Sequence, residues 1–141
     1  MKIRVQGGLP YVTASLIHNG RTLELDWVVL DTASGSSVFS ADELLQLGIE
    51  GGPNDRVRRI TGVGGRELVI TKRIDGVMLG ETELRGVEIQ IGAMNYGFPI
   101  QGIIGLNFLL QVGAVIDLDR LELFERRSSR EGVPDNESTP Q

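Results

Sequence analysis

The spacing of glycine is the feature of this sequence that most limits its fold. The chain of 141 residues contains 19 glycines, scattered between short apolar runs, and only 5% of its residues are aromatic. Short apolar runs bounded by turn residues predict strands joined by tight turns. The length is that of one domain whose core needs no disulfide. We therefore predict an all-β domain over residues 1–125 and a flexible polar tail over residues 126–141.

Composition removes several kinds of chemistry. The chain has no cysteine and one histidine, His18, which excludes thiol catalysis, cysteine-based metal centres and multi-histidine metal sites. The net charge of −5 gives no electrostatic reason to expect nucleic acid as a partner. No segment reaches the roughly 20 apolar residues of a membrane helix, and the N-terminus is unlike a signal peptide. We expect a cytoplasmic protein with no membrane partner, no metal and no cofactor, in which carboxylates remain for chemistry.

Alternating apolar residues predict the individual strands. Residues 11–17 alternate and residues 18–20 form a turn, so a hairpin follows. Its second strand is expected to place one set of side chains on a single face: Leu23, Leu25, Trp27 and Val29. The pattern predicts further extended segments at residues 38–39, 77–79, 87–91, 102–104, 114–118 and 121–124.

Two short helices are expected between these strands. Ser40 and Glu43 have the spacing of a capping box, which predicts a helix that ends at Gly48. A second helix is predicted after the bend at Gly105, and Gly113 ends it.

A glycine-rich turn lies between two extended segments at residues 60–65, with the sequence Ile-Thr-Gly-Val-Gly-Gly. A phosphate-binding loop would need a helix after the glycines and usually a lysine, whereas a strand follows here. We therefore interpret these residues as the tip of a long hairpin whose backbone can approach a ligand closely.

Asp31 is the candidate functional residue of the chain. It follows the aliphatic residues 28–30 and precedes a turn of small residues, Thr32, Ala33, Ser34 and Gly35. A carboxylate in that place is costly to desolvate unless something uses it or satisfies its charge. Taken alone, the tetrapeptide leaves two interpretations open: a functional carboxylate, or an Asx turn in which Asp31 simply caps the backbone.

The ordered combination of three motifs resembles the retropepsins, the single-domain aspartic proteases of retroviruses and their cellular and bacterial relatives. The motifs are the Asp-Thr-small loop, the glycine-tipped hairpin and the run from Ile103 to Gly113, which is similar to the retroviral pattern Ile-Ile-Gly-Arg-Asn-Leu-Leu-Thr-Gln-Ile-Gly. The resemblance implies a closed β-barrel with a flap hairpin. It also implies an aspartic endopeptidase that cleaves extended polypeptides, as a homodimer in which each chain supplies one Asp31.

The resemblance further assigns roles to particular residues. Asp31 is the catalytic residue, and Thr32 and Ala33 support the pair of aspartates. Residues of the loop, the flap and the following motif are expected to bind substrate: Ser34, Gly35, Thr61, Gly62, Val63, Gly64 and Ile103.

The chain departs from the retroviral pattern at two places. Ala33 stands where the family usually has glycine, and Gly35 and Leu106 occupy the positions of an Asp–Arg ion pair. These departures leave open a non-catalytic peptide-binding or dimerisation module on the same fold. The strand pattern also fits an unrelated small β-barrel that binds a ligand in its mouth, although that alternative leaves the order of the three motifs unexplained.

Overall fold

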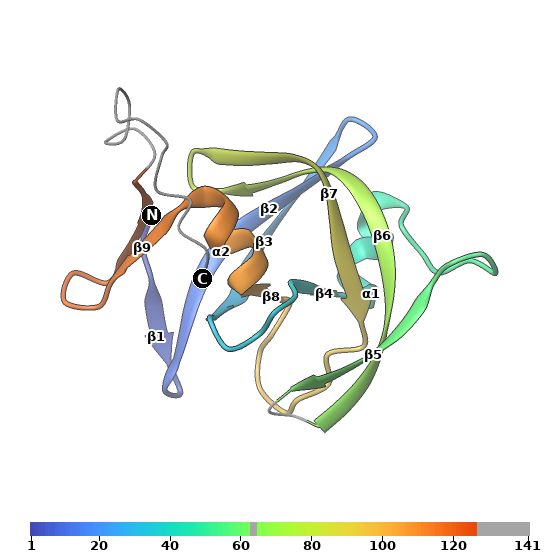
Figure 1. Cartoon of the computed structure of the whole chain (residues 1–141), viewed down its shortest axis with the longest axis horizontal. Helices are drawn as coiled ribbons and strands as arrows, with labels where there is room; N and C mark the ends of the chain where they lie inside the picture. The colour runs from blue at the N-terminus through green and yellow to red at the C-terminus, as the bar shows by residue number, and fades with distance from the viewer. Residues whose placement is uncertain (63–64, 127–141) are drawn as a thin grey trace, which may run out of the picture.

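The computed structural model describes residues 1–62 and 65–126 (Figure 1). Val63 and Gly64 of the predicted flap tip, and all of the predicted tail except Arg126, lie outside the described residues. The strands are β1 Arg4–Gln6, β2 Leu9–His18, β3 Arg21–Asp31, β4 Val38–Ser40, β5 Val57–Gly62, β6 Gly65–Leu79, β7 Thr82–Gly92, β8 Gly102–Gly105, β9 Ala114–Asp117 and β10 Glu122–Glu125. The helices are α1 Ala41–Leu44, the 3-10 turn η1 Leu45–Leu47 and α2 Leu106–Val112.

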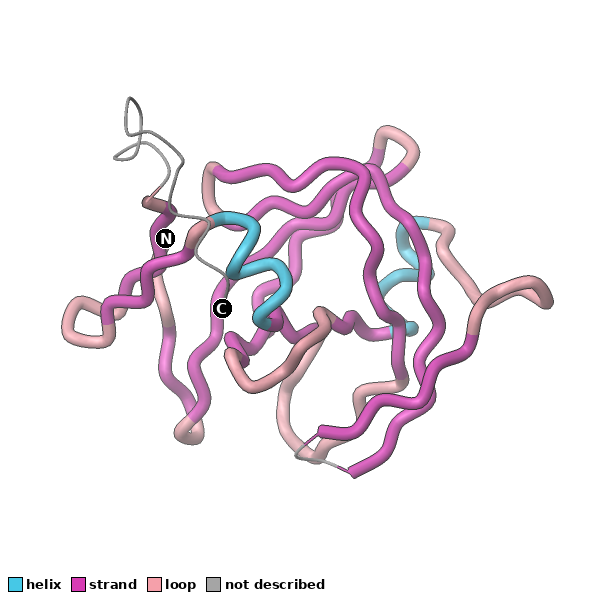
Figure 2. Tube along the Cα trace, viewed as in Figure 1, coloured by secondary structure: helices cyan, strands magenta, loops and turns pink. Residues whose placement is uncertain are grey.

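Six strands close into a barrel, which confirms the predicted fold class. The hydrogen-bonded order runs β2, β3, β8, β4, β7 and β6, and β6 pairs with β2 again to complete the ring. Figure 2 shows the strands wrapping around one interior. Closure pairs the strand edges within the ring, while β1 and β5 extend the sheet from β2 and β6.

The barrel contains one unusual crossing, and it positions the candidate site. β3 and β4 are close in sequence, yet β8 from the C-terminal third lies between them. β3 pairs with β8 in parallel, and β4 pairs with β8 antiparallel. The loop between β3 and β4 must therefore arch over the end of β8, where α2 begins.

One continuous apolar cluster fills the barrel, and the side chains that β3 contributes to it differ from the predicted set. Leu25, Val28 and Leu30 are the buried residues of β3 in this cluster, whereas a strict alternation would have placed Trp27 there with Leu25. The register against β2 shifts between Val12 and Ala14, so β3 gains one residue and its inward face changes parity. Trp27 instead packs edge-on against Tyr11, with ring centroids 5.1 Å apart.

The first helical segment has the predicted extent, with the 3-10 turn η1 as its last part, but its capping box does not form. Ser40 is the N-cap residue, but its buried side chain makes no capping hydrogen bond. Glu43 accepts a hydrogen bond from the side-chain amide of Gln101 at 3.0 Å instead of reaching back to the helix start. Gly48 ends the segment in the left-handed conformation, as predicted.

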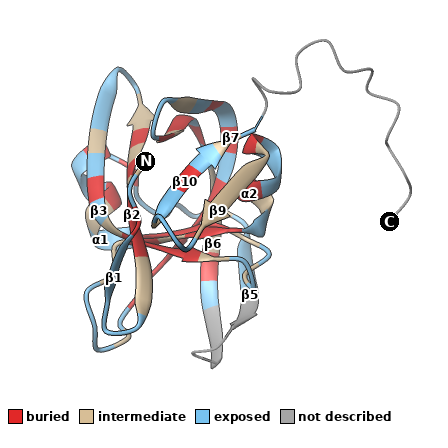
Figure 3. Cartoon of the chain, turned by 90° about the vertical axis from the view of Figure 1, so that its left-hand side faces the viewer, coloured by how far each residue is buried: buried red, intermediate tan, exposed pale blue. Residues whose placement is uncertain are grey.

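The N-terminal residues meet β9 and β10 in a small sheet beside the barrel (Figure 3). β10 pairs antiparallel with β9, and a bridge joins Lys2 to Glu122 on its other side. β5 pairs antiparallel with β6 and is the last strand of the eight-stranded order, so these two strands form the predicted long hairpin. In the described part of the chain, no helix is long and apolar enough to span a bilayer.

Candidate active site

Asp31 lies at the last position of β3, opposite Gly105, the last residue of β8. The aliphatic residues before it are buried in the barrel, whereas Asp31 itself is half-buried and the next two residues, Thr32 and Ala33, are exposed. The apolar strand therefore carries the carboxylate to the rim of the barrel and stops there. A carboxylate at this rim is held by a rigid element and still reaches solvent.

The loop after Asp31 fixes the direction of its side chain. The Ala33 N–H donates a hydrogen bond to Asp31 Oδ1 at 2.9 Å, and the Ser34 N–H donates to the Asp31 carbonyl at 3.1 Å. This is the geometry of an Asx turn, so that interpretation is correct for the backbone. It does not compete with a functional role, because the turn engages Oδ1 and thereby orients the carboxylate.

The far side of the loop is tied to the start of α2. The Leu106 N–H donates to the Ser34 carbonyl at 2.7 Å, and the Ser34 hydroxyl donates to the Ser36 carbonyl at 2.7 Å. The buried Ser37 hydroxyl accepts from the Gly105 N–H at 2.9 Å and is 2.9 Å from Asn107 Oδ1. These contacts make the Asp31 loop and the β8–α2 corner one hydrogen-bonded unit.

The same corner leaves no room for a side chain on Gly105. A Cβ atom built there would lie 2.2 Å from the Ser36 carbonyl oxygen and 2.7 Å from that of Ser34. Both contacts are to backbone, so neither can be relieved by a side-chain rotation. The glycine of the Ile-Ile-Gly motif is therefore required by the close approach of the Asp31 loop.

The two departures from the retroviral pattern lie on the surface. Ala33 is exposed, so its methyl group does not crowd the interior of the loop. Gly35 has open space where a side chain would be, and Leu106 is 39% exposed at the first position of α2. No charge is buried at either position.

The remaining predicted residues are distributed between two places. Thr61 and Gly62 lie in β5, paired with Arg66 and Gly65 of β6. Ile103 is half-buried in β8, packed against a small cluster that includes Val38 and Val69. Because β8 pairs with both β3 and β4, Ile103 lies close to the Asp31 loop. Thr61 and Gly62 belong instead to the β5–β6 hairpin.

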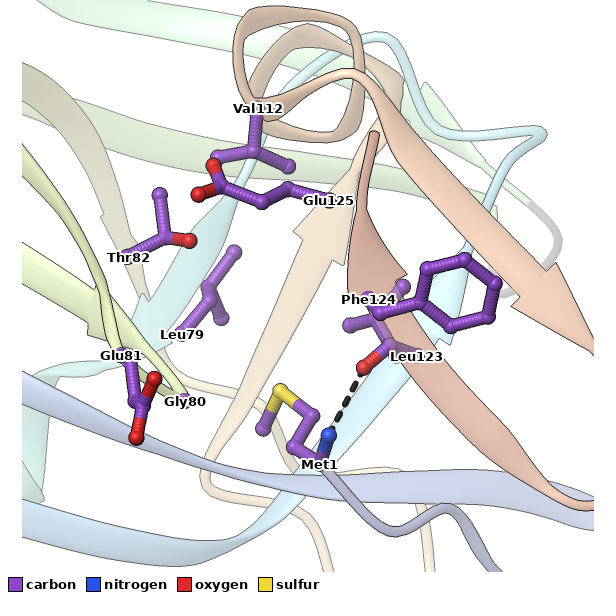
Figure 4. A pocket seen from close by; sticks show the side chains of 9 residues that line it. All are labelled: Met1, Leu79, Gly80, Glu81, Thr82, Val112, Leu123, Phe124 and Glu125. Carbon is purple, nitrogen blue, oxygen red and sulfur yellow. Dashed lines mark hydrogen bonds between the residues drawn. The ribbon is translucent and has the colours of Figure 1, made fainter. Parts of the chain in front are cut away.

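A hollow of about 470 Å³ is lined by residues of β6, α2 and β10 together with Met1, and Asp31 is not among them (Figure 4). It has an apolar floor that includes Leu79 and Val112, with Glu81 and Glu125 beside it, and the terminal ammonium of Met1 donates to the Leu123 carbonyl at 2.8 Å nearby. A second hollow of about 450 Å³ is lined by residues of α1 and η1 on one side and by residues 68–70 of β6 on the other. Asp31 is not among the residues that line either of these two hollows.

Comparison with known proteins defines the class of this barrel and its aspartate loop. Residues 12–108 match the family described as aspartyl protease, and because this is more than half of the sequence, the chain belongs to that family. Its fold is similar to that of a retropepsin-like aspartic protease from Rickettsia conorii, with a TM-score of 0.61 and 17% identity, over 87% of this chain and 95% of that one. At this identity, the likeness concerns the fold alone. No curated protein matches the sequence.

The sequence did not identify Ser37 as a residue that holds the Asp31 loop against the β8–α2 corner. A serine directly before a buried pair of apolar residues was the available signal, since a hydroxyl in that place must find a partner. Asn107 was present in the quoted motif, but its contact with Ser37 depends on a pairing 70 residues apart, which no local pattern reveals.

Proposed function

We propose that this chain is an aspartic endopeptidase that hydrolyses extended polypeptides, and that its active form is a homodimer with one Asp31 from each copy. The observation that carries this proposal is the position of Asp31. It is half-buried at the end of a core strand, and Ala33 orients it at 2.9 Å. Membership of the aspartyl protease family supports the reaction class.

The chemistry requires two carboxyl groups close together. Repulsion between like charges leaves one of them protonated and one ionised, so the ionised group activates a water molecule and the protonated group polarises the peptide carbonyl. One chain offers one such loop, and a two-fold axis supplies the second. The pair then titrates as a unit, and a mildly acidic range of activity is expected.

The loop also suggests how two copies support each other. Thr32 is exposed next to Asp31. By its resemblance to the family motif, we expect the Thr32 hydroxyl to hydrogen bond across the axis. The β5–β6 hairpin is the element we propose for holding an extended substrate by backbone contacts, together with Ser34, Gly35 and Ile103 beside the carboxylates. Extended peptides fit such a site because a strand-like backbone presents its hydrogen-bonding groups to both sides.

Replacement of Asp31 by asparagine tests the proposal. The amide is nearly isosteric but cannot act as the base, so Asp31→Asn should reduce cleavage of casein at about pH 5 to background. Wild-type cleavage should be sensitive to pepstatin. Sedimentation and circular dichroism should show an unchanged dimer and fold, and unchanged turnover in the variant would remove Asp31 from the mechanism.

A non-catalytic binding or dimerisation module is the second candidate. The exposed Ala33 and the apolar Leu106 at the two departures favour it, because both alter the surroundings of the expected pair of aspartates. In that case the wild type would bind an extended peptide without cleaving it, which isothermal titration and mass spectrometry of the peptide would show together.

A further inference from the structure

One row of cross-strand partners joins the strand of Asp31 to the arginines of the β5–β6 hairpin (Figure 1). Partners that stand opposite each other share one face of a sheet. The row crosses β3, β8, β4, β7 and β6 in that order and consists of Val29, Ile103, Val38, Gln90 and Thr71. The Thr71 N–H donates to the Arg56 carbonyl at 3.2 Å, so Arg56 continues the row directly before β5. Asp31 lies two residues after Val29, and Arg58 lies two residues after Arg56, so both share this face.

This face is the outer face of the barrel sheet. The sequence neighbours of the row residues belong to the core cluster: Val28, Leu30, Phe39, Ile89, Ile91 and Ile104. Val38 and Ile103 of the row belong instead to a second cluster, together with Val69. Val69 stands opposite Arg58 in the hairpin. The arginine therefore lies beside the apolar cluster that contains Ile103, on the face to which Asp31 belongs.

Gln90 places an unused hydrogen-bond donor in this row. Its side chain is buried, with the residue 8% exposed, and its Oε1 atom accepts a hydrogen bond from the Thr71 hydroxyl at 3.0 Å. Within the described part of the chain, its Nε2 atom donates to no protein acceptor. A primary amide has two N–H donors, and buried donors nearly always have an acceptor. An acceptor atom of a ligand would satisfy this amide.

The two arginines at the end of the row are not used in ion pairs. Arg56 and Arg58 are exposed, and neither takes part in an ion pair within residues 1–62 and 65–126. Asp55, the neighbour of Arg56, is paired with Lys72 at 2.8 Å. Both guanidinium groups are therefore left to bind a ligand.

The carboxylates of the chain do not occupy this part of the face. Residues 32–37, which follow Asp31, include no acidic residue. Glu88 lies two residues before Gln90 on β7, but it stands opposite Arg73. A guanidinium group binds a planar carboxylate through two parallel hydrogen bonds, and an amide N–H can add a third. A carboxylate is therefore the ligand group that suits these three side chains.

We propose that Arg56, Arg58 and the side-chain amide of Gln90 form a specificity site for an aspartate or glutamate side chain of the polypeptide bound at Asp31. The inference rests on the proposed function, because it concerns the choice of polypeptide by the same site. Arg56 and Arg58 supply the charge, and Gln90 supplies a donor from a buried position.

The length of the row limits where the acidic residue can lie in the polypeptide. Five strand spacings of about 4.8 Å separate β3 from β5, which is a path of about 24 Å along the curved sheet. An extended chain covers about 3.3 Å per residue. The acidic side chain should therefore lie within about seven residues of the bond that is cleaved.

Binding of dephosphorylated casein tests the site without relying on cleavage. In an Asp31→Asn background, which keeps the casein intact, Arg58→Gln should raise the dissociation constant at least about fivefold at pH 6 by fluorescence anisotropy. Arg59→Gln is the matched control, because it removes the same charge from the next residue of β5, on the opposite face. It should change the constant less than about twofold. Equal effects of the two variants would overturn the proposal.

The position of the bonds cleaved in the same casein provides the second test. Mass spectrometry of wild-type fragments should show aspartate and glutamate enriched at one fixed distance from the cleaved bond. The enrichment should be lost in Arg58→Gln and kept in Arg59→Gln. Cleavage without an enrichment that depends on Arg58 would overturn the specificity site and keep the enzyme. A dissociation constant that depends on Arg58, without any cleavage, would keep the site and remove the enzyme.

Gln90→Glu tests the amide separately. The substitution is nearly isosteric and retains an acceptor for the Thr71 hydroxyl, but it replaces the N–H donors with a negative charge. It should weaken casein binding more than Arg58→Gln does, while circular dichroism shows an unchanged fold. Unchanged binding by a folded Gln90→Glu variant would overturn the part assigned to Gln90.

Discussion

Ser37 and Gly105 are joined by a buried hydrogen bond of 2.9 Å from the glycine N–H to the serine hydroxyl. The bond connects the Asp31 loop to the residue opposite Asp31 in the neighbouring strand. The hydroxyl can donate in turn to Asn107 Oδ1, so both of its hydrogen-bonding functions are used. Ser37 is thus the internal support of the candidate site.

Removal of this hydroxyl should destabilise the fold. Ser37→Ala leaves the Gly105 N–H buried without a partner, which costs about 1–3 kcal/mol in the free energy of unfolding. Asn107→Ala should cost less, because the bond from Gly105 to Ser37 remains. Urea denaturation of the three proteins measures the difference, and equal stability of Ser37→Ala and wild type would show that the bond contributes nothing.

Two glycines of the site should respond very differently to alanine. Gly105→Ala forces a methyl group against the Ser36 carbonyl at 2.2 Å, so we expect a loss of about 3 kcal/mol or failure to fold. Gly35→Ala enters open space and should change stability by no more than about 0.5 kcal/mol. Thermal denaturation of both variants provides the comparison, and similar melting temperatures would contradict the close approach of the loop to β8.

The predictions made from sequence succeeded where the signal is local. Alternation and glycine turns located the barrel strands, and the order of three motifs located the Asp31 loop and the β8–α2 corner. The orientation of Trp27 was wrong because a register shift opposite it depends on the pairing with β2. The capping box at Ser40 was wrong because Glu43 is held by Gln101, which is 58 residues away. Both errors arise where a tertiary contact overrides a local preference.

Ala33→Gly distinguishes an adapted enzyme from an inactive module. The methyl group is exposed and the Ala33 N–H already holds Asp31, so we expect little change in turnover. The glycine should lower stability by up to about 1 kcal/mol through the greater freedom of the unfolded chain. Peptide cleavage by both proteins between about pH 4 and 7 is the measurement. A wild type that cleaves no peptide, together with an Ala33→Gly variant that does, would favour the non-catalytic module.

The ion pair between Asp55, in the loop before β5, and Lys72 of β6 should make the stability of the fold depend on pH. Lys72 Nζ lies 2.8 Å from Asp55 Oδ1, and the Gly52 N–H donates to the same carboxylate. The hydrogen bond from Lys72, followed by that from Gly52, lowers the pKa of Asp55 below its ordinary 3.8. A lowered folded-state pKa gives stability that is complete above the unfolded pKa and is lost as the pH falls through the folded value.

Asp55→Asn should therefore melt at a lower temperature than wild type near neutral pH. The difference should stay constant down to about pH 5 and begin to shrink near pH 4, where Asp55 of the unfolded chain takes up a proton, and it should disappear once the folded carboxyl is also protonated at lower pH. Adding Lys72→Met to this variant should cause little further loss, because the pair is already broken. A difference that grows as the pH falls would have the wrong sign for a lowered pKa.

The insertion of β8 between β3 and β4 has a consequence for the synthesis of the protein. Asp31 leaves the ribosome early, but its neighbouring strand ends at Gly105 and the helix that supports its loop ends at Val112. Contacts between such distant residues form slowly and late. Until Gly105 has been synthesised, the nascent chain therefore carries the carboxylate without the strand that positions it. The site is assembled only when most of the domain has been translated.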